Sequence, residues 1–262
     1  MTSAQFEEPA SYSPSSLSQF TTCPLAFRFS YVEHIPQPPQ IAATKGTVVH
    51  RALEILFNRP EQDRTITNAQ IDLSTAMHEY STHKDFVDLE LNNEASEKFY
   101  NECKLLVDKY FQLEDPKKIK PIGLELKLEA KVGDTLIRGI IDRLELDENE
   151  NLVVTDYKTG SVPRANNEQS KLGGVHLYAL LCERVFGQIP AKVQLLYLAT
   201  PGAIVATPTK STLKGVESRS NAIHKAVQTA CNNGDFRPKE SILCNWCGYQ
   251  ALCPAKGGTL PS

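Results

Sequence analysis

The chain has 262 residues, 41% of them hydrophobic, which is enough for one large domain or two small ones with a sizeable core. A formal net charge of -3 excludes binding of nucleic acid through overall positive charge, so any DNA contact would have to use local basic patches. No segment reaches the roughly 18 apolar residues of a membrane span, and no leader pattern opens the chain. We therefore expect a cytoplasmic protein with no membrane partner.

The first part of the chain carries mainly helical patterns. We expect a flexible N-terminal tail over residues 1–14, followed by one domain over residues 15–262. Ser15 or Ser16 can cap a short helix, and residues 25–35 form an aromatic-rich helical segment. Apolar residues at spacings of three and four predict further helices over 44–57, 68–83 and 92–113. These segments predict a helical lobe over residues 15–115.

The pattern changes to strands after Pro116. Strands are predicted over 122–132, 135–147 and 152–159, then a helix over 168–186, strands over 192–199 and 203–209, and a helix to Cys231. This order predicts an α/β fold, a mixed sheet flanked by helices over residues 116–235. Residues 236–262 form a loop-like, cysteine-rich tail.

Two acidic residues are expected to meet in the hairpin whose turn is centred near Asn149. Asp142 and Asp156 are each seven residues from this centre, so they lie opposite one another. Because side chains alternate along a strand, Asp156 shares one face with Lys158 and with apolar residues. That apolar set is Ile140, Leu144, Leu146, Leu152 and Val154.

Two opposed carboxylates on an apolar face repel one another, and buried carboxylates normally protonate, pair or hold a metal. Carboxylates that hold Mg²⁺ or Mn²⁺ leave coordination positions for a phosphate oxygen and a water, and the amine of Lys158 can balance developing negative charge. This set suits phosphodiester hydrolysis. The alternative is that Asp156, Tyr157 and Lys158 form a solvent-facing triplet of no special function.

Two further residues are candidates for this site. His50 lies on a helical stripe with Leu53 and Phe57, where a histidine is more often a core residue than a ligand, although its imidazole can complete a metal shell. Glu125 alternates with the apolar residues of its strand, so its parity alone predicts exposure to solvent.

A second group of candidates is formed by cysteines near the C-terminus. Cys244, Cys247 and Cys253 are closely spaced, and Cys23 is available about 220 residues upstream as a fourth ligand. This pattern favours a thiolate-bound metal. Three clustered ligands favour an iron-sulfur cluster, and a zinc ion is the alternative that the spacing leaves open. The metal would link the two ends of the chain and have a structural role. The other three cysteines are predicted to be buried thiols: Cys103, Cys182 and Cys231.

Six segments in order carry a resemblance to a known family: SLSQFTTCPLAFRF, GTVVH, GIIDR, DYKTG, LYALL and CNWCGYQALCP. The chain resembles the RecB-like branch of the PD-(D/E)xK nucleases, in particular stand-alone RecB-family exonucleases related to the AddB nuclease domain and to the CRISPR adaptation nucleases. The resemblance runs from Ser15 to Cys253. It implies a restriction-endonuclease-like fold and a metal-dependent exonuclease that acts on single-stranded DNA ends in DNA repair or recombination.

The resemblance also implies roles for individual residues. His50, Asp142, Asp156 and the carbonyl of Tyr157 would bind Mg²⁺ or Mn²⁺, Lys158 would be the catalytic lysine, and Glu125 would be the upstream acidic residue. A 4Fe-4S cluster would be held by Cys23, Cys244, Cys247 and Cys253.

The chain departs from the family at one motif. Tyr178 matches the tyrosine of the family's Q-x-x-x-Y motif, but Gly174 stands where the family has glutamine. Gln169 and His176 are the nearest substitutes. This departure supports an alternative function, a non-catalytic DNA-binding or adaptor module that partners a helicase.

Overall fold

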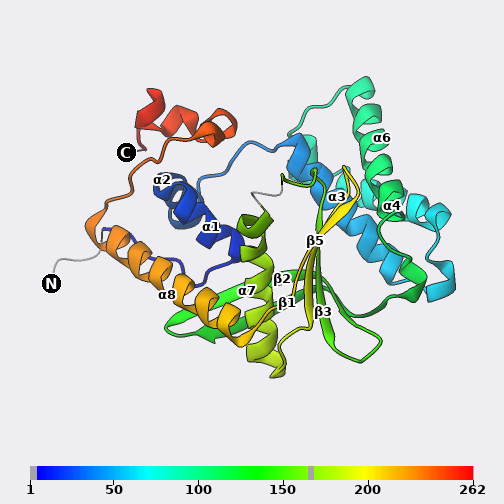
Figure 1. Cartoon of the computed structure of the whole chain (residues 1–262). Helices are drawn as coiled ribbons and strands as arrows, with labels where there is room; N and C mark the ends of the chain where they lie inside the picture. Colours follow the sequence, from blue (N-terminus) through cyan, green and yellow to red (C-terminus); the bar gives the residue numbers. More distant parts are fainter. Residues whose placement is uncertain (1–4, 165–167, 262) are drawn as a thin grey trace. The chain divides into compact units, whose positions relative to one another are not determined.

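The fold is built on one mixed β-sheet, seen in a computed structural model that describes residues 5–164 and 168–261 (Figure 1). Its five strands follow the order β1-β2-β3-β4-β5. β3 pairs antiparallel with β2 and parallel with β4, and β4 pairs antiparallel with β5. The strands are β1 Lys120–Val132, β2 Thr135–Leu146, β3 Leu152–Lys158, β4 Lys192–Tyr197 and β5 Gly202–Ala206. The predicted α/β class with a mixed sheet is confirmed.

The helices lie close to their predicted positions. The α-helices are α1 Pro14–Thr22, α2 Pro24–Phe27, α3 Ile41–Phe57, α4 Ile66–Tyr80, α5 Lys84–Val87, α6 Asn93–Tyr110, α7 Glu168–Phe186 and α8 Lys210–Asn233. The aromatic-rich segment continues from α2 into a π-helix, η1 Arg28–Val32. Short 3-10 helices are η2 Glu61–Asp63, η3 Pro116–Lys118, η5 Ile242–Trp246, η6 Gln250–Leu252 and η7 Pro254–Lys256. In the described parts of the chain, no helix combines the length and apolar character needed to cross a membrane.

The chain forms two compact units, and the boundary between them falls within β1 and β2. The first unit comprises residues 1–38, 129–139 and 211–262, and the second comprises residues 39–128 and 140–210. Within the predicted helical lobe, α1, α2 and η1 therefore belong to the first unit, whereas α3 to α6 belong to the second.

The core of the second unit forms between α3, α4, α6 and one face of the sheet. Val49 and Leu53 of α3 are fully buried against Leu73 of α4 and Val107 of α6, and Tyr157 of β3 joins the same cluster. The helix α7 connects the parallel strands β3 and β4 and packs on them (Figure 1). Side chains on both faces of β3 are consequently buried.

Described residues near the N-terminus, from Phe6 onward, pack on the first unit, although we expected a flexible tail up to Pro14. Phe6 donates a backbone hydrogen bond to the Cys231 carbonyl (3.1 Å), and its ring meets Phe236 edge to face. Tyr12 is only 2% exposed and pairs with β2 through backbone hydrogen bonds. The cap of α1 is Ser13, whose hydroxyl accepts from the Ser16 amide, in place of the predicted Ser15 or Ser16.

Candidate active site

The predicted hairpin register is confirmed. Arg143 pairs with Thr155 and Leu144 with Val154, so Asp142 and Asp156 are the next opposed residues along the two strands. The turn forms because the Asp147 carboxylate accepts hydrogen bonds from the amides of Asn149 and Asn151 (2.8 and 2.9 Å).

The apolar face predicted around these acids is largely present. Leu144, Leu152 and Val154 are buried and Leu146 is partly buried. Ile140 is 44% exposed, contrary to the prediction, because the odd-numbered positions of β2 are the buried ones over residues 135–141. Asp156 is only 6% exposed, so the solvent-facing alternative for this residue is wrong.

Asp142 is held by contacts from two other elements. Its Oδ2 accepts a hydrogen bond from the Tyr157 amide (2.7 Å) and lies 3.4 Å from Nδ1 of His50. The other ring nitrogen of His50 lies 3.1 Å from the Tyr157 carbonyl oxygen. Burial acts to lower the pKa of His50, but the Asp142 carboxylate outweighs burial, so the pKa is raised. The helix α3 thus directs His50 to the end of the hairpin.

Glu125 approaches this group because the alternation of β1 is interrupted. Its φ is +43°, a left-handed conformation that is unusual for any residue but glycine and typical of a β-bulge. The Glu125 side chain is consequently half-buried, and the prediction of exposure is wrong. Burial, together with the charge of Asp142, raises the pKa of Glu125 to about 7.

Three of these side chains are arranged as a metal-ligand group. One potential ligand atom each from His50, Glu125 and Asp142 lies within 4.8 Å of the others. Adjacent oxygen ligands of an octahedral Mg²⁺ are about 3 Å apart and opposite ones about 4 Å apart. The donor set therefore fits one divalent ion without large movements of the main chain.

Asp156 lies beside this group and pairs with Lys158. The Lys158 ammonium forms an ion pair with Oδ2 of Asp156, which is a buried oxygen. Burial, together with the Asp142 charge, raises the pKa of Asp156 to about 6. Burial acts to lower the pKa of Lys158, but Asp156 outweighs it, so the pKa is raised. Such an oxygen can accept a cation.

Tyr178 also lies in the electrostatic field of this site. Its phenol is half-buried in α7, and its pKa is raised by burial and then by the charges of Asp156, Asp142 and Glu125. The side chain of Gln169 lies outside the described residues.

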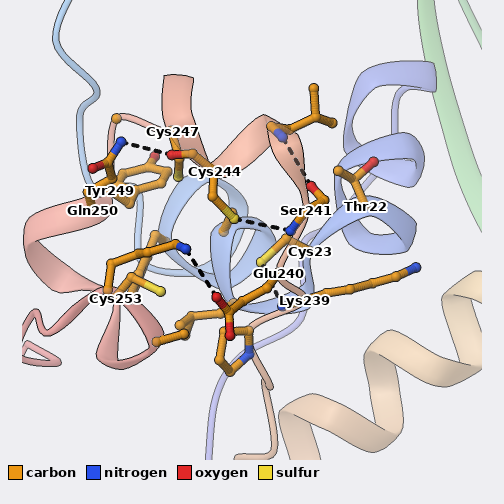
Figure 2. Close-up of a pocket in the computed structure, with 18 of the residues that line it drawn as sticks. Thr22, Cys23, Lys239, Glu240, Ser241, Cys244, Cys247, Tyr249, Gln250 and Cys253 are labelled. Carbon is orange, nitrogen blue, oxygen red and sulfur yellow. Dashed lines mark hydrogen bonds and ion pairs between the residues drawn. The ribbon is translucent and has the colours of Figure 1, made fainter.

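The four candidate cysteines line one pocket of about 270 Å³ in the first unit (Figure 2). Cys23 lies between α1 and α2, and Cys244, Cys247 and Cys253 come from the C-terminal 3-10 segments. The three other cysteines are buried elsewhere, as predicted: Cys103, Cys182 and Cys231.

Two cysteine sulfurs in this pocket accept backbone hydrogen bonds. The Lys239 amide donates to Sγ of Cys23 (3.5 Å) and the Ser241 amide to Sγ of Cys244 (3.4 Å). Such donors stabilise thiolates that bind metals.

A third polar cluster was missed by the sequence analysis. The Arg143 side chain is fully buried and pairs with Glu114 (2.8 Å) and Glu145. Arg143 and Glu145 stand two residues apart on one strand face, with Thr155 opposite Arg143. The sequence did contain a signal for this cluster: an arginine and a glutamate two residues apart in a strand otherwise rich in apolar residues.

Comparisons with known proteins agree with this architecture. The sequence model of the PD-(D/E)XK nuclease superfamily matches residues 11–254. The "Gene 69 protein" of Mycobacterium phage D29 is 24% identical over 265 residues, covering 92% of this chain and 96% of the phage protein. A solved structure named "Putative exonuclease" from Eubacterium rectale has 11% identity and a TM-score of 0.53, covering 91% of this chain and 87% of its own. The similarity to the Eubacterium rectale structure concerns the fold alone.

Because the family match spans most of the chain, this protein belongs to the PD-(D/E)XK nuclease superfamily. The ligand group of His50, Glu125 and Asp142 is of the kind with which a metal-dependent nuclease binds its ion.

Proposed function

We propose that this protein is a divalent-metal-dependent exonuclease that hydrolyses single-stranded DNA from its ends in DNA repair or recombination. The observation that carries the proposal is the convergence of His50, Glu125 and Asp142 beside the buried pair of Asp156 and Lys158. The preference for single-stranded ends rests on the sequence resemblance to stand-alone RecB-family exonucleases.

The proposed ligands of Mg²⁺ or Mn²⁺ are His50, Asp142, Asp156 and the carbonyl of Tyr157, with Glu125 as a further acidic contact. Their donors are one imidazole nitrogen and otherwise oxygen, which suits a hard divalent ion. When bound, such an ion polarises a phosphoryl oxygen and acidifies a water. The Asp156 carboxylate is buried and already faces one cation, the Lys158 ammonium, which supports its assignment as a ligand.

Lys158 is the proposed catalytic lysine. Its raised pKa keeps the amine protonated at neutral pH, so it can orient the attacking water or stabilise negative charge that develops on the phosphate. Tyr178 is proposed to orient the DNA end or the lysine, since its phenol shares the field of the same carboxylates.

The test of the proposal is cleavage of end-labelled single- and double-stranded DNA with Mg²⁺ or Mn²⁺. We expect Lys158→Ala to reduce the cleavage rate by about 100-fold or more, because the charge that balances the transition state is lost. Lys98→Ala, which removes an exposed lysine from α6, is the matched control and should cleave like the wild type.

Full activity of pure Lys158→Ala protein would refute the assigned site. DNA binding by the wild type without metal-dependent cleavage on any substrate would favour a non-catalytic adaptor of a helicase instead.

We further propose that Cys23, Cys244, Cys247 and Cys253 hold a 4Fe-4S cluster with a structural role. Support comes from their shared pocket and from the amides that donate to two of the sulfurs. The cluster would link the α1–α2 junction to the C-terminal segment within the first unit.

A further inference from the structure

Arg143 directly follows Asp142 in β2, and its buried guanidinium contacts the neighbouring strand β3. Nη1 donates to the hydroxyl of Tyr157 (2.6 Å), and Nη2 lies 3.3 Å from the hydroxyl of Thr155. Nη2 also donates to both carboxylate oxygens of Glu114 (3.0 and 2.8 Å). Because neighbouring side chains alternate, these contacts lie on the sheet face opposite to Asp142.

The two β3 residues that Arg143 contacts are the residues on either side of Asp156. Tyr157 has a second connection to the site through its main chain. Its amide donates to Asp142, and its carbonyl oxygen lies in hydrogen-bond range of His50. Arg143 therefore contacts β3 beside two proposed ligands, Asp156 and the Tyr157 carbonyl, and the main chain of Tyr157 contacts the other two, Asp142 and His50.

The guanidinium itself has little freedom to move. Glu114 and Glu145 flank it with carboxylates, and Gln194 of β4 donates to both Thr155 (2.8 Å) and Glu114 (3.0 Å). Charge-assisted hydrogen bonds in a buried environment are stronger and more directional than exposed ones. This network is therefore a rigid support for β3.

We propose that Arg143 is a positioning residue of the metal site, acting through the hydroxyl and main chain of Tyr157. The inference rests on the proposed function and deepens it. Residues that orient metal ligands from behind typically change metal affinity by about 10- to 100-fold when altered. A residue that only stabilises the core would change the melting temperature and leave metal affinity as it was.

The test is a Mn²⁺ titration of the full-length protein, in which the EPR signal of the free ion measures how much Mn²⁺ is unbound. Tyr157→Phe removes the 2.6 Å hydrogen bond to Arg143 but keeps the ring in the core and the carbonyl at the site. We expect its dissociation constant for Mn²⁺ to rise about 10-fold or more. Excess Mn²⁺ should restore its cleavage rate, since the catalytic groups are retained.

Tyr110→Phe is the matched control. The Tyr110 hydroxyl also contacts the network, at 3.3 Å from Arg143 and 3.1 Å from Glu114, but its main chain belongs to α6. We expect this variant to lose thermal stability and to bind Mn²⁺ like the wild type.

Thr155→Val is a second test on the other side of Asp156, should Tyr157→Phe not fold. It removes the hydroxyl that Arg143 and Gln194 contact and preserves the shape of the side chain. Weakened Mn²⁺ binding is again expected. Wild-type affinity in the folded variants would refute the inference alone, whereas absence of Mn²⁺ binding by the wild-type protein would refute the proposed metal site as well.

Discussion

Two carboxyl groups of the second unit have pKa values moved toward neutrality by their surroundings. Burial, reinforced by the charge of Asp142, raises the pKa of Asp156 to about 6 and that of Glu125 to about 7. Each point of pKa shift corresponds to about 1.4 kcal/mol of difference between the two protonation states. In the metal-free protein, these acids are therefore partly protonated at neutral pH.

This protonation makes metal binding depend on pH. Because both pKa values are raised, the folded metal-free protein binds more protons than the unfolded chain, and these groups cost stability as the pH rises through about 4 to 7. A divalent ion requires the deprotonated forms, and a neutral His50, so its binding tightens over the same range. We expect Mn²⁺ to raise the melting temperature more at pH 8 than at pH 6.

Thermal unfolding with and without Mn²⁺ at both pH values measures this difference. Glu125→Gln is the control, since it removes one of the titrating groups and should reduce the pH dependence. An equal or larger effect of Mn²⁺ at pH 6 would contradict the prediction.

Within a strand, the local backbone conformation decides which side chains reach the site. Glu125 takes a positive φ inside β1, so the side chain that parity directs to solvent turns toward Asp142. A non-glycine residue in this region costs about 1 to 3 kcal/mol and is often found at functional sites. The strain at Glu125 is thus part of how the strand delivers an acid to the ligand group.

Replacement by alanine is expected to have opposite effects on stability at two glycines of the first unit. Gly215 lies exposed within α8, and a methyl group added there would meet no heavy atom within 4 Å, so Gly215→Ala should raise the free energy of unfolding by about 0.5 to 1 kcal/mol. Gly133 turns from β1 to β2 with φ +60°, and an added Cβ would lie 2.6 Å from the Asn221 side chain.

Gly133→Ala should therefore lower the free energy of unfolding by about 1 kcal/mol or more. Urea denaturation of both variants measures the two effects. A stabilised Gly133→Ala variant would show that the turn readily adopts another conformation.

In the molecule as a whole, the first unit is formed by segments that are far apart in the sequence. Its three stretches are residues 1–38, 129–139 and 211–262, and Cys23 meets Cys244, Cys247 and Cys253 across one pocket. A bound cluster would close a loop of more than 200 residues, and such links stabilise a fold mainly by restricting the unfolded chain. Loss of the cluster should therefore destabilise this unit.

We expect Cys253→Ser to lose most of its iron and to melt at a lower temperature than the wild type, because one of four ligands is replaced by a weaker one. Iron analysis and visible absorbance of anaerobically prepared protein provide the measurement. Cys231→Ala, which removes a buried thiol of the same unit, should keep its iron. Colourless wild-type protein that contains zinc and no iron would contradict the cluster.

Sequence patterns alone were sufficient to predict the class of fold and the register that opposes Asp142 to Asp156. Both follow from local rules, since alternation in strands, helical periodicity and a polar turn depend on residues close together in the chain. The sequence also grouped Cys23 with the C-terminal cysteines through their types and spacing, before the structure showed a common pocket.

The positions of Glu125 and Arg143 beside the candidate site became visible only in the folded structure. The left-handed backbone at Glu125 interrupts the alternation on which strand predictions depend, and no residue type in β1 indicates it. Arg143 acquires its partners from α6, from β3 and from the segment that carries Glu114, which are joined only by folding. Contacts between distant segments depend on the packing of the whole unit, and local patterns do not encode that packing.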